Sequence, residues 1–160
     1  MDFNRRVEMI YFKLWDCEIT DIPIPEDWQP FTRPQLPQEH PWRHMPNWLR
    51  HKISFTDEIT INFYTQKADF ELPFHKDDGP KCALNYVIQG DKPIVFEDYG
   101  PVDYKFGLMN VSQRHMVPAG KVDRVLLRYS FMSLDFDTVS ERLTKLIDSK
   151  KSLTYDQLNQ

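Results

Sequence analysis

Between residues 58 and 132 the chain is a succession of short strand-like segments separated by turn residues, and this pattern constrains the fold most. In the first segment Ile59, Ile61 and Phe63 alternate with polar residues, which is the period of a half-buried strand. Other strand-like segments lie at 7–15, 81–98, 104–111 and 122–132. Many short strands at close spacing predict an antiparallel double sheet of about eight strands, as in a sandwich or barrel.

Two local predictions complete the pattern. Within 81–98, the residues Gln89 to Lys92 have the length of a hairpin turn between two strands. One helix is expected at 138–150, outside the double sheet, because its apolar residues fall on one stripe. Asp137 or Thr138 can cap its start.

Prolines organise the first third of the chain. Seven of the twelve prolines lie at 23–46, where proline's fixed φ and missing amide donor exclude a central strand or a long helix. The aromatic residues of this stretch indicate an arm that packs on the domain rather than a free linker; they are Trp28, Phe31, Trp42 and Trp48. We therefore expect a single domain over 1–160, with an irregular arm at 17–50 and a loose tail at 151–160.

Charge and composition exclude several classes of partner. The formal net charge is −4, which supplies no basic surface for a nucleic-acid backbone. No apolar run reaches the roughly 18–20 residues that span a bilayer, so no membrane partner is expected. Two cysteines are too few for a disulfide framework or a cysteine-rich zinc site. We expect a soluble, cytoplasmic protein.

Few residues are suited to catalysis, and those that are point to a metal. His75 and Asp77 are two positions apart, so on an extended strand their side chains project to the same side. His115 follows about three strands later. Two imidazoles and one carboxylate can bind one face of a six-coordinate Fe(II) and leave the opposite face open. The alternative interpretation is a surface turn with an ion pair and an unrelated, half-buried histidine.

Two arginines share one face of the last predicted strand. Arg124 and Arg128 project opposite the apolar residues of 122–132, so both can point into the double sheet. A guanidinium in the interior needs an anionic partner, and its fork suits a carboxylate. Arg128 is a candidate for substrate binding, although a structural salt bridge is an alternative. Arg124 could likewise pair with Asp123.

These residues resemble the pattern of the Fe(II)/2-oxoglutarate-dependent dioxygenases over roughly residues 51–133. The similarity, closest to prolyl-hydroxylase-like and aspartyl-hydroxylase-like members, is carried by FHKDDGPKCALNYVIQGDKPIVFED and NVSQRHMVPAGKVDRVLLRYSF. Members combine His-x-Asp, a distal His and a later Arg or Lys on a double-stranded β-helix, the jelly-roll also seen in cupins. Arg124 lies nine residues after His115.

The resemblance implies a fold and a set of roles. The fold is all-β, a cupin-like double-stranded β-helix with one C-terminal helix. His75, Asp77 and His115 would bind Fe(II), and Arg124 would pair with the distal carboxylate of 2-oxoglutarate. Tyr64 stands about one strand upstream of His-x-Asp, where prolyl-hydroxylase-like members often carry a cosubstrate-binding tyrosine. No catalytic residue beyond the metal centre is implied.

The implied activity is hydroxylation of an unidentified substrate by dioxygen, with 2-oxoglutarate converted to succinate and CO2. The substrate would be a peptide or protein side chain or a small metabolite. Two alternatives remain: a non-catalytic jelly-roll with a structural or binding role, and a cupin-like metalloprotein that uses the same ligands without 2-oxoglutarate. The role of Arg124 separates the dioxygenase from the second alternative, and an intact metal triad separates both metalloproteins from the first.

Overall fold

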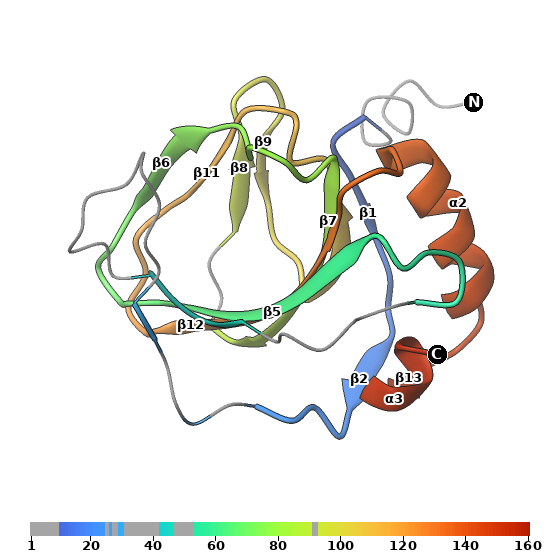
Figure 1. The fold of residues 1–160 in the computed structure, drawn as a ribbon. Helices are drawn as coiled ribbons and strands as arrows, with labels where there is room; N and C mark the ends of the chain where they lie inside the picture. The colour runs from blue at the N-terminus through green and yellow to red at the C-terminus, as the bar shows by residue number, and fades with distance from the viewer. Residues whose placement is uncertain (1–9, 25, 27–28, 31–41, 47–52, 91–92) are drawn as a thin grey trace.

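The computed structural model describes residues 10–24, 26, 29–30, 42–46, 53–90 and 93–160, which form two facing antiparallel sheets (Figure 1). In spatial order, the large sheet contains β1 (Phe12–Leu14), β10 (Phe106–Met109), β7 (Cys82–Gln89), β12 (Arg124–Phe131), β5 (Ile59–Gln66), β4 (Trp42–Pro46) and β3 (Gln29–Pro30). The small sheet contains β6 (Leu72–His75), β11 (His115–Val117), β8 (Ile94–Phe96) and β9 (Gly100–Val102).

The eight consecutive strands β5 to β12 have the topology of a jelly-roll. Strands β5, β7, β10 and β12 belong to the large sheet, whereas β6, β8, β9 and β11 belong to the small one. The chain therefore crosses repeatedly between the sheets, and the last strand of the set pairs with the first, β12 with β5. The predicted all-β double-stranded β-helix is confirmed. Strands β1, β3 and β4 extend the large sheet beyond it.

The predicted hairpin after β7 is wrong. Both edges of β7 are already paired, with β10 and β12, so β8 joins the small sheet instead. Gly90, at φ +96°, takes a conformation that favours glycine where the chain leaves the large sheet. A Cβ atom at Gly90 would lie 3.1 Å from the Cα of Arg124, so this turn packs closely against the start of β12.

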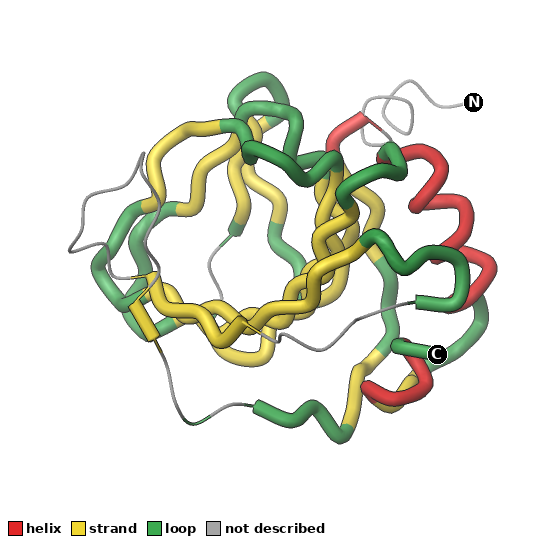
Figure 2. Tube along the Cα trace, in the orientation of Figure 1, coloured by secondary structure: helices red, strands yellow, loops and turns green. Residues whose placement is uncertain are grey.

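Helix α2 (Phe136–Ile147) lies beside the large sheet, on the side away from the small one (Figures 1 and 2). The largest hydrophobic core among the described residues lies between this helix and the large sheet. Strand β12 contributes Leu127, Tyr129 and Phe131, and the helix contributes Leu143, which is fully buried. Each large apolar side chain buried in this way contributes about 1.5–3 kcal/mol. Because this core covers the outer face of the sheet, the inner face is available for polar residues.

Helix α2 begins earlier than predicted. The carboxylate of Asp135, rather than Asp137 or Thr138, caps the helix by accepting a hydrogen bond from the backbone N–H of Thr138 at 2.8 Å. The early start adds the buried Phe136 to the apolar face of the helix. No helix among the described residues has the length and apolar character needed to cross a membrane.

The predicted loose tail is also wrong. Strand β13 (Ser152–Thr154) pairs in parallel with β2 (Glu18–Thr20), and the short helix α3 (Tyr155–Leu158) follows it. Leu158 is fully buried in the outer core, and the Tyr129 hydroxyl donates a hydrogen bond to the side chain of Asn159. Apolar residues at the end of the chain therefore close the outer core.

The arm predicted at 17–50 contributes three short strands, β2, β3 and β4. Strand β4 pairs with β5 and β3 beside the edge of the large sheet, which is compatible with proline at its end. The predicted packing of the arm's aromatic side chains lies outside what the structure describes. Of the strand predicted at 7–15, the structure describes β1, and 7–9 are outside the described residues.

The interior of the double sheet contains all five buried polar side chains of the described residues. They are Gln66, Asn85, His115, Arg124 and Ser130. Four of them project from the large sheet, at positions alternating with those that pack in the outer core. His115 reaches the interior from the small sheet. Since buried polar groups need partners, this interior is where a functional site is expected.

Candidate metal centre

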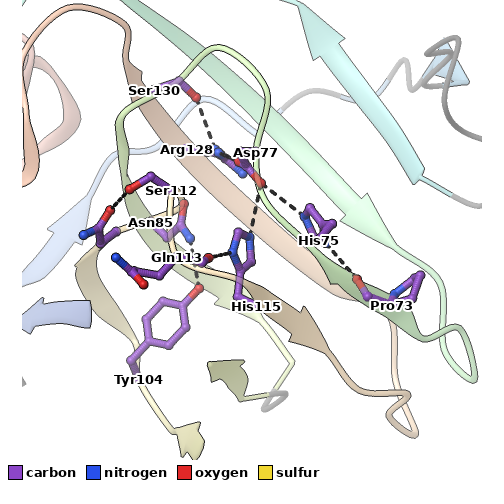
Figure 3. Close-up of polar contacts among 11 residues, drawn as sticks. Pro73, His75, Asp77, Asn85, Tyr104, Ser112, Gln113, His115, Arg128 and Ser130 are labelled. Carbon is purple, nitrogen blue, oxygen red and sulfur yellow. Dashed lines mark hydrogen bonds and ion pairs between the residues drawn. The ribbon is translucent and has the colours of Figure 1, made fainter. Parts of the chain in front are cut away.

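Three side chains converge between the sheets (Figure 3). His75 ends β6 and His115 begins β11, and the two residues are partners in the antiparallel register. Asp77 follows in the turn after β6. Its Oδ1 atom lies 3.1 Å from the Nε2 atom of each histidine. The three potential ligand atoms lie within 4.8 Å of one another, a spacing that one metal ion can bridge.

Backbone carbonyls orient both imidazole rings. The Nδ1 atom of His75 lies 2.8 Å from the carbonyl oxygen of Pro73, and that of His115 lies 2.7 Å from the carbonyl oxygen of Gln113. A carbonyl can only accept, so each Nδ1 carries a proton, and in the neutral ring the lone pair is on Nε2. Such second bonds are typical of metal-binding histidines, because they fix the ring and its tautomer.

Asp77 is held on two sides. Its backbone N–H donates to the carbonyl of Val111 at 3.0 Å, which ties the turn after β6 to the segment leading into β11. Its Oδ2 atom accepts a hydrogen bond from the guanidinium of Arg128, while Oδ1 faces the histidines. The two carboxylate oxygens therefore have different partners, one cationic side chain and one potential metal position.

Electrostatics maintain Asp77 as a carboxylate. Burial, the largest effect, opposes ionisation, but the charge of Arg128 and the hydrogen bonds that both histidines donate from Nε2 when their rings are protonated outweigh it and hold the pKa of Asp77 well below its usual range. Burial also opposes the charged form of His75 and so lowers its pKa. The hydrogen bonds of His75 to Asp77 and to the carbonyl of Pro73 nevertheless raise that pKa overall. Both shifts favour the charged forms of the two side chains.

The site is more accessible on one side. The His75 side chain is 33% exposed, whereas that of His115 is 4% exposed. His115 packs beside the ring of Phe96, with centroids 6.1 Å apart. Solvent and ligands therefore have access from the His75 side, and His115 forms the buried wall.

Arg124 is buried in the same interior and has an unpaired donor. One Nη of this buried residue donates to the hydroxyl of Tyr104 at 2.5 Å, and Asn85 Nδ2 donates to the same oxygen at 3.1 Å. Its Nε has no hydrogen-bond partner among the described residues. An orphaned donor on a buried cation is costly, about 1–3 kcal/mol or more. A carboxylate bound at this point would satisfy it.

The other two predicted residues lie near the metal triad. Tyr64 is on the inner face as expected, where its hydroxyl accepts from Asn62 at 3.1 Å and its ring lies 6.0 Å from the Cζ of Arg128. Arg128 was a candidate for substrate binding, with a structural salt bridge as the alternative. In the structure it forms an ion pair with Asp77. The tyrosine that contacts Arg124 is Tyr104.

Sequence reasoning missed Tyr104 and Asn85. Neither stands in a motif, and Tyr104 lies in the loop between β9 and β10, which carries no signal of function. A weak signal existed for Asn85, a polar residue inside the apolar run of β7. Such a residue in a strand buried on both faces indicates a partner in the interior.

The donor set fits a divalent transition metal. Two imidazole nitrogens and one carboxylate oxygen converge, both rings are fixed with Nε2 available, and the carboxylate is charged. Nitrogen and oxygen ligands of this kind suit Fe(II), Mn(II), Ni(II) or Zn(II). This double-stranded β-helix therefore contains a group that could bind a metal.

Comparison with known proteins adds similarities of fold. No family model and no curated protein matches the chain. Among solved structures, an RmlC-like cupin protein from Desulfovibrio desulfuricans is 23% identical over 49% of this chain and 78% of its own, with a TM-score of 0.37. Ectoine synthase from P. lautus is 16% identical over 63% and 71%, with a TM-score of 0.40.

Salicylate 1,2-dioxygenase from Pseudaminobacter salicylatoxidans is a third similar structure. It is 11% identical over 65% of this chain and 28% of its own, with a TM-score of 0.42. These similarities are distant, and the fold class of the present chain follows from its own strand order. No activity is carried over from these proteins.

Proposed function

We propose that this protein is a non-haem Fe(II) and 2-oxoglutarate-dependent dioxygenase that hydroxylates a peptide side chain or a small metabolite. The observation that supports the proposal is one interior with two complementary sites. The triad of His75, Asp77 and His115 is oriented for a metal, and in the same interior the buried Arg124 has an unpaired donor for a carboxylate. A dicarboxylate that binds the metal through one end could pair its other carboxylate with such a cation in a charge-assisted hydrogen bond.

In this proposal the metal supplies the oxidative chemistry, and the protein supplies orientation and charge. His75, Asp77 and His115 would hold the ion and would leave its other positions for cosubstrate and dioxygen. The buried wall around His115 limits the access of water from that side.

Arg124 and Tyr104 are the proposed anchor for the distal carboxylate. The Tyr104 oxygen accepts hydrogen bonds from Arg124 and Asn85, which use its acceptor positions and leave its proton to be donated elsewhere. The Nε–H of Arg124 is a second available donor. Two donors on neighbouring groups match the two oxygens of one carboxylate.

The second candidate is a metalloprotein of this fold that does not use 2-oxoglutarate. The bond between Arg124 and Tyr104 favours it, because this bond already occupies part of the guanidinium. In that case the Arg124 side chain would stabilise the interior and would bind no cosubstrate.

The anaerobic absorption spectrum distinguishes the two candidates. Chelation of Fe(II) by 2-oxoglutarate produces a visible charge-transfer band, so we expect the band when both are added to the wild-type protein. The Asp77→Ala variant, which lacks one ligand, is the control. Metal binding without the band would favour the second candidate, and no metal binding would contradict both.

A further inference from the structure

We propose that Arg128 is a positioning residue that restricts Asp77 to a single coordinating oxygen, and thereby sets how many positions on the metal stay open. The inference rests on the proposed metal site and concerns a residue outside the ligand set. Its basis is the partition of the Asp77 carboxylate described above, in which Oδ2 accepts from Arg128 and Oδ1 faces both histidines.

Arg128 is itself held from two directions. Its Nη2 contacts Asp77, and its Nε donates to the hydroxyl of Ser130 at 3.2 Å (Figure 3). The ring of Tyr64 lies 6.0 Å from its Cζ atom, within the range of a cation–π contact. With both ends of the guanidinium engaged, rotation of the Asp77 carboxylate would break a charge-assisted bond.

The backbone that carries this clamp is also fixed. Arg128 lies in the middle of β12, where its register partners are Asn62 on β5 and Asn85 on β7. The side chains of Arg128 and Asp77 are 16% and 10% exposed, so little water competes for their contact. A buried, charged hydrogen bond on a strand paired along both edges is a rigid support.

The clamp affects the metal because a carboxylate can bind through one oxygen or two. With one oxygen from Asp77 and two imidazoles, an octahedral ion keeps about three open positions, the number needed for a chelating cosubstrate and dioxygen. Chelation by both Asp77 oxygens would take one of them. Oδ2 is the oxygen that Arg128 engages, so the clamp prevents that loss.

The test counts the waters bound to Mn(II), using the ion alone as probe and pulsed electron paramagnetic resonance in D2O. We expect about three waters for wild type and about two for Arg128→Met, in which Oδ2 is released to the ion. Arg142→Met is the matched control, because Arg142 is an exposed arginine on the outer helix α2. Its count is expected to equal that of wild type.

Arg128→Lys covers the case in which Arg128→Met does not fold. Lysine keeps a cation beside Asp77 but lacks the fork that bonds Asp77 and Ser130 together, so we expect an average count between about two and three. Circular dichroism of each metal-free variant establishes folding. A wild-type water count in every folded Arg128 variant would overturn the clamp and leave the metal site intact. Failure of wild type to bind Mn(II) would overturn the metal site and the clamp with it.

Discussion

His75 and His115 face each other as register partners on the antiparallel strands β6 and β11, with ring centroids 4.4 Å apart. The two residues are 40 positions apart in the sequence. Their proximity follows from the jelly-roll crossing, which places the second and seventh of its eight strands side by side in the small sheet. The positions of the two imidazoles at the metal site therefore depend on the pairing of β6 with β11.

Loss of a ligand should weaken metal binding strongly. We expect His115→Ala and Asp77→Ala to weaken Mn(II) or Fe(II) binding by more than about 100-fold, since loss even of an outer-shell partner costs about 10- to 100-fold. Isothermal titration calorimetry measures the change. Asp78→Asn, which removes the exposed neighbouring carboxylate, should bind like wild type. Wild-type affinity in both ligand variants would refute the triad.

Arg124 should affect the cosubstrate and not the metal. Loss of a charge-assisted pair costs about 2–5 kcal/mol, so Arg124→Ala should raise the 2-oxoglutarate concentration required for succinate formation by roughly 30-fold or more. Mn(II) affinity should stay near that of wild type, because no ligand is removed. Arg124→Lys should recover only part of the activity. Wild-type kinetics in Arg124→Ala would remove Arg124 from the cosubstrate site.

The two tyrosines should differ. Tyr104→Phe removes a hydroxyl that contacts Arg124 and is expected to raise the required 2-oxoglutarate concentration by about 5- to 10-fold, the value of one hydrogen bond. Tyr64→Phe keeps the ring beside Arg128 and should leave that concentration unchanged. Spectroscopic titration of 2-oxoglutarate into the anaerobic Fe(II) protein measures both. A higher required concentration for Tyr64→Phe and no change for Tyr104→Phe would assign the cosubstrate contact to Tyr64, as predicted from the sequence.

Metal affinity should fall as the pH is lowered. Burial, the largest effect, lowers the pKa of His75, but its hydrogen bonds to Asp77 and Pro73 and the charge of Asp77 together raise that pKa overall. Below the raised pKa, a metal must displace the proton that this ring carries. Below the raised pKa we expect affinity to drop by about tenfold per pH unit. Calorimetry of Mn(II) binding at about pH 8, 7 and 6 tests this. In the metal-free protein, the same shift stabilises the fold below the unfolded pKa, and this stabilisation is lost as pH rises through the folded pKa.

The end of the chain should be essential for stability. Leu158 is fully buried beneath the large sheet, so Leu158→Ala is expected to lower the free energy of unfolding by about 2–5 kcal/mol. Gln160→Ala, at the exposed last residue, should have no measurable effect. Urea unfolding followed by circular dichroism compares them. Equal stability of the two variants would be consistent with the loose tail expected from sequence.

Local patterns were sufficient where a residue's role depends on its neighbours along the chain. The alternation in β5 and β12 predicted the strands, and the opposite projection of Arg124 and Leu127 on β12 follows from the period of two. The hairpin after β7 failed because a turn of suitable length does not reveal that both edges of β7 are occupied by distant strands. Asp135 was missed as the helix cap because the sequence pattern did not show that the helix begins at Phe136.

The sequence by itself determined the all-β class and the face of β12 from which both arginines project. It also carried the motif resemblance from which the metal triad was predicted. Only the tertiary structure decided the partners of the two arginines. Arg128 meets Asp77 and Arg124 meets Tyr104, because strand order and register bring together residues that lie far apart in the chain. Side-chain direction is a local property of an extended backbone, whereas contact across a double sheet depends on which strands become neighbours.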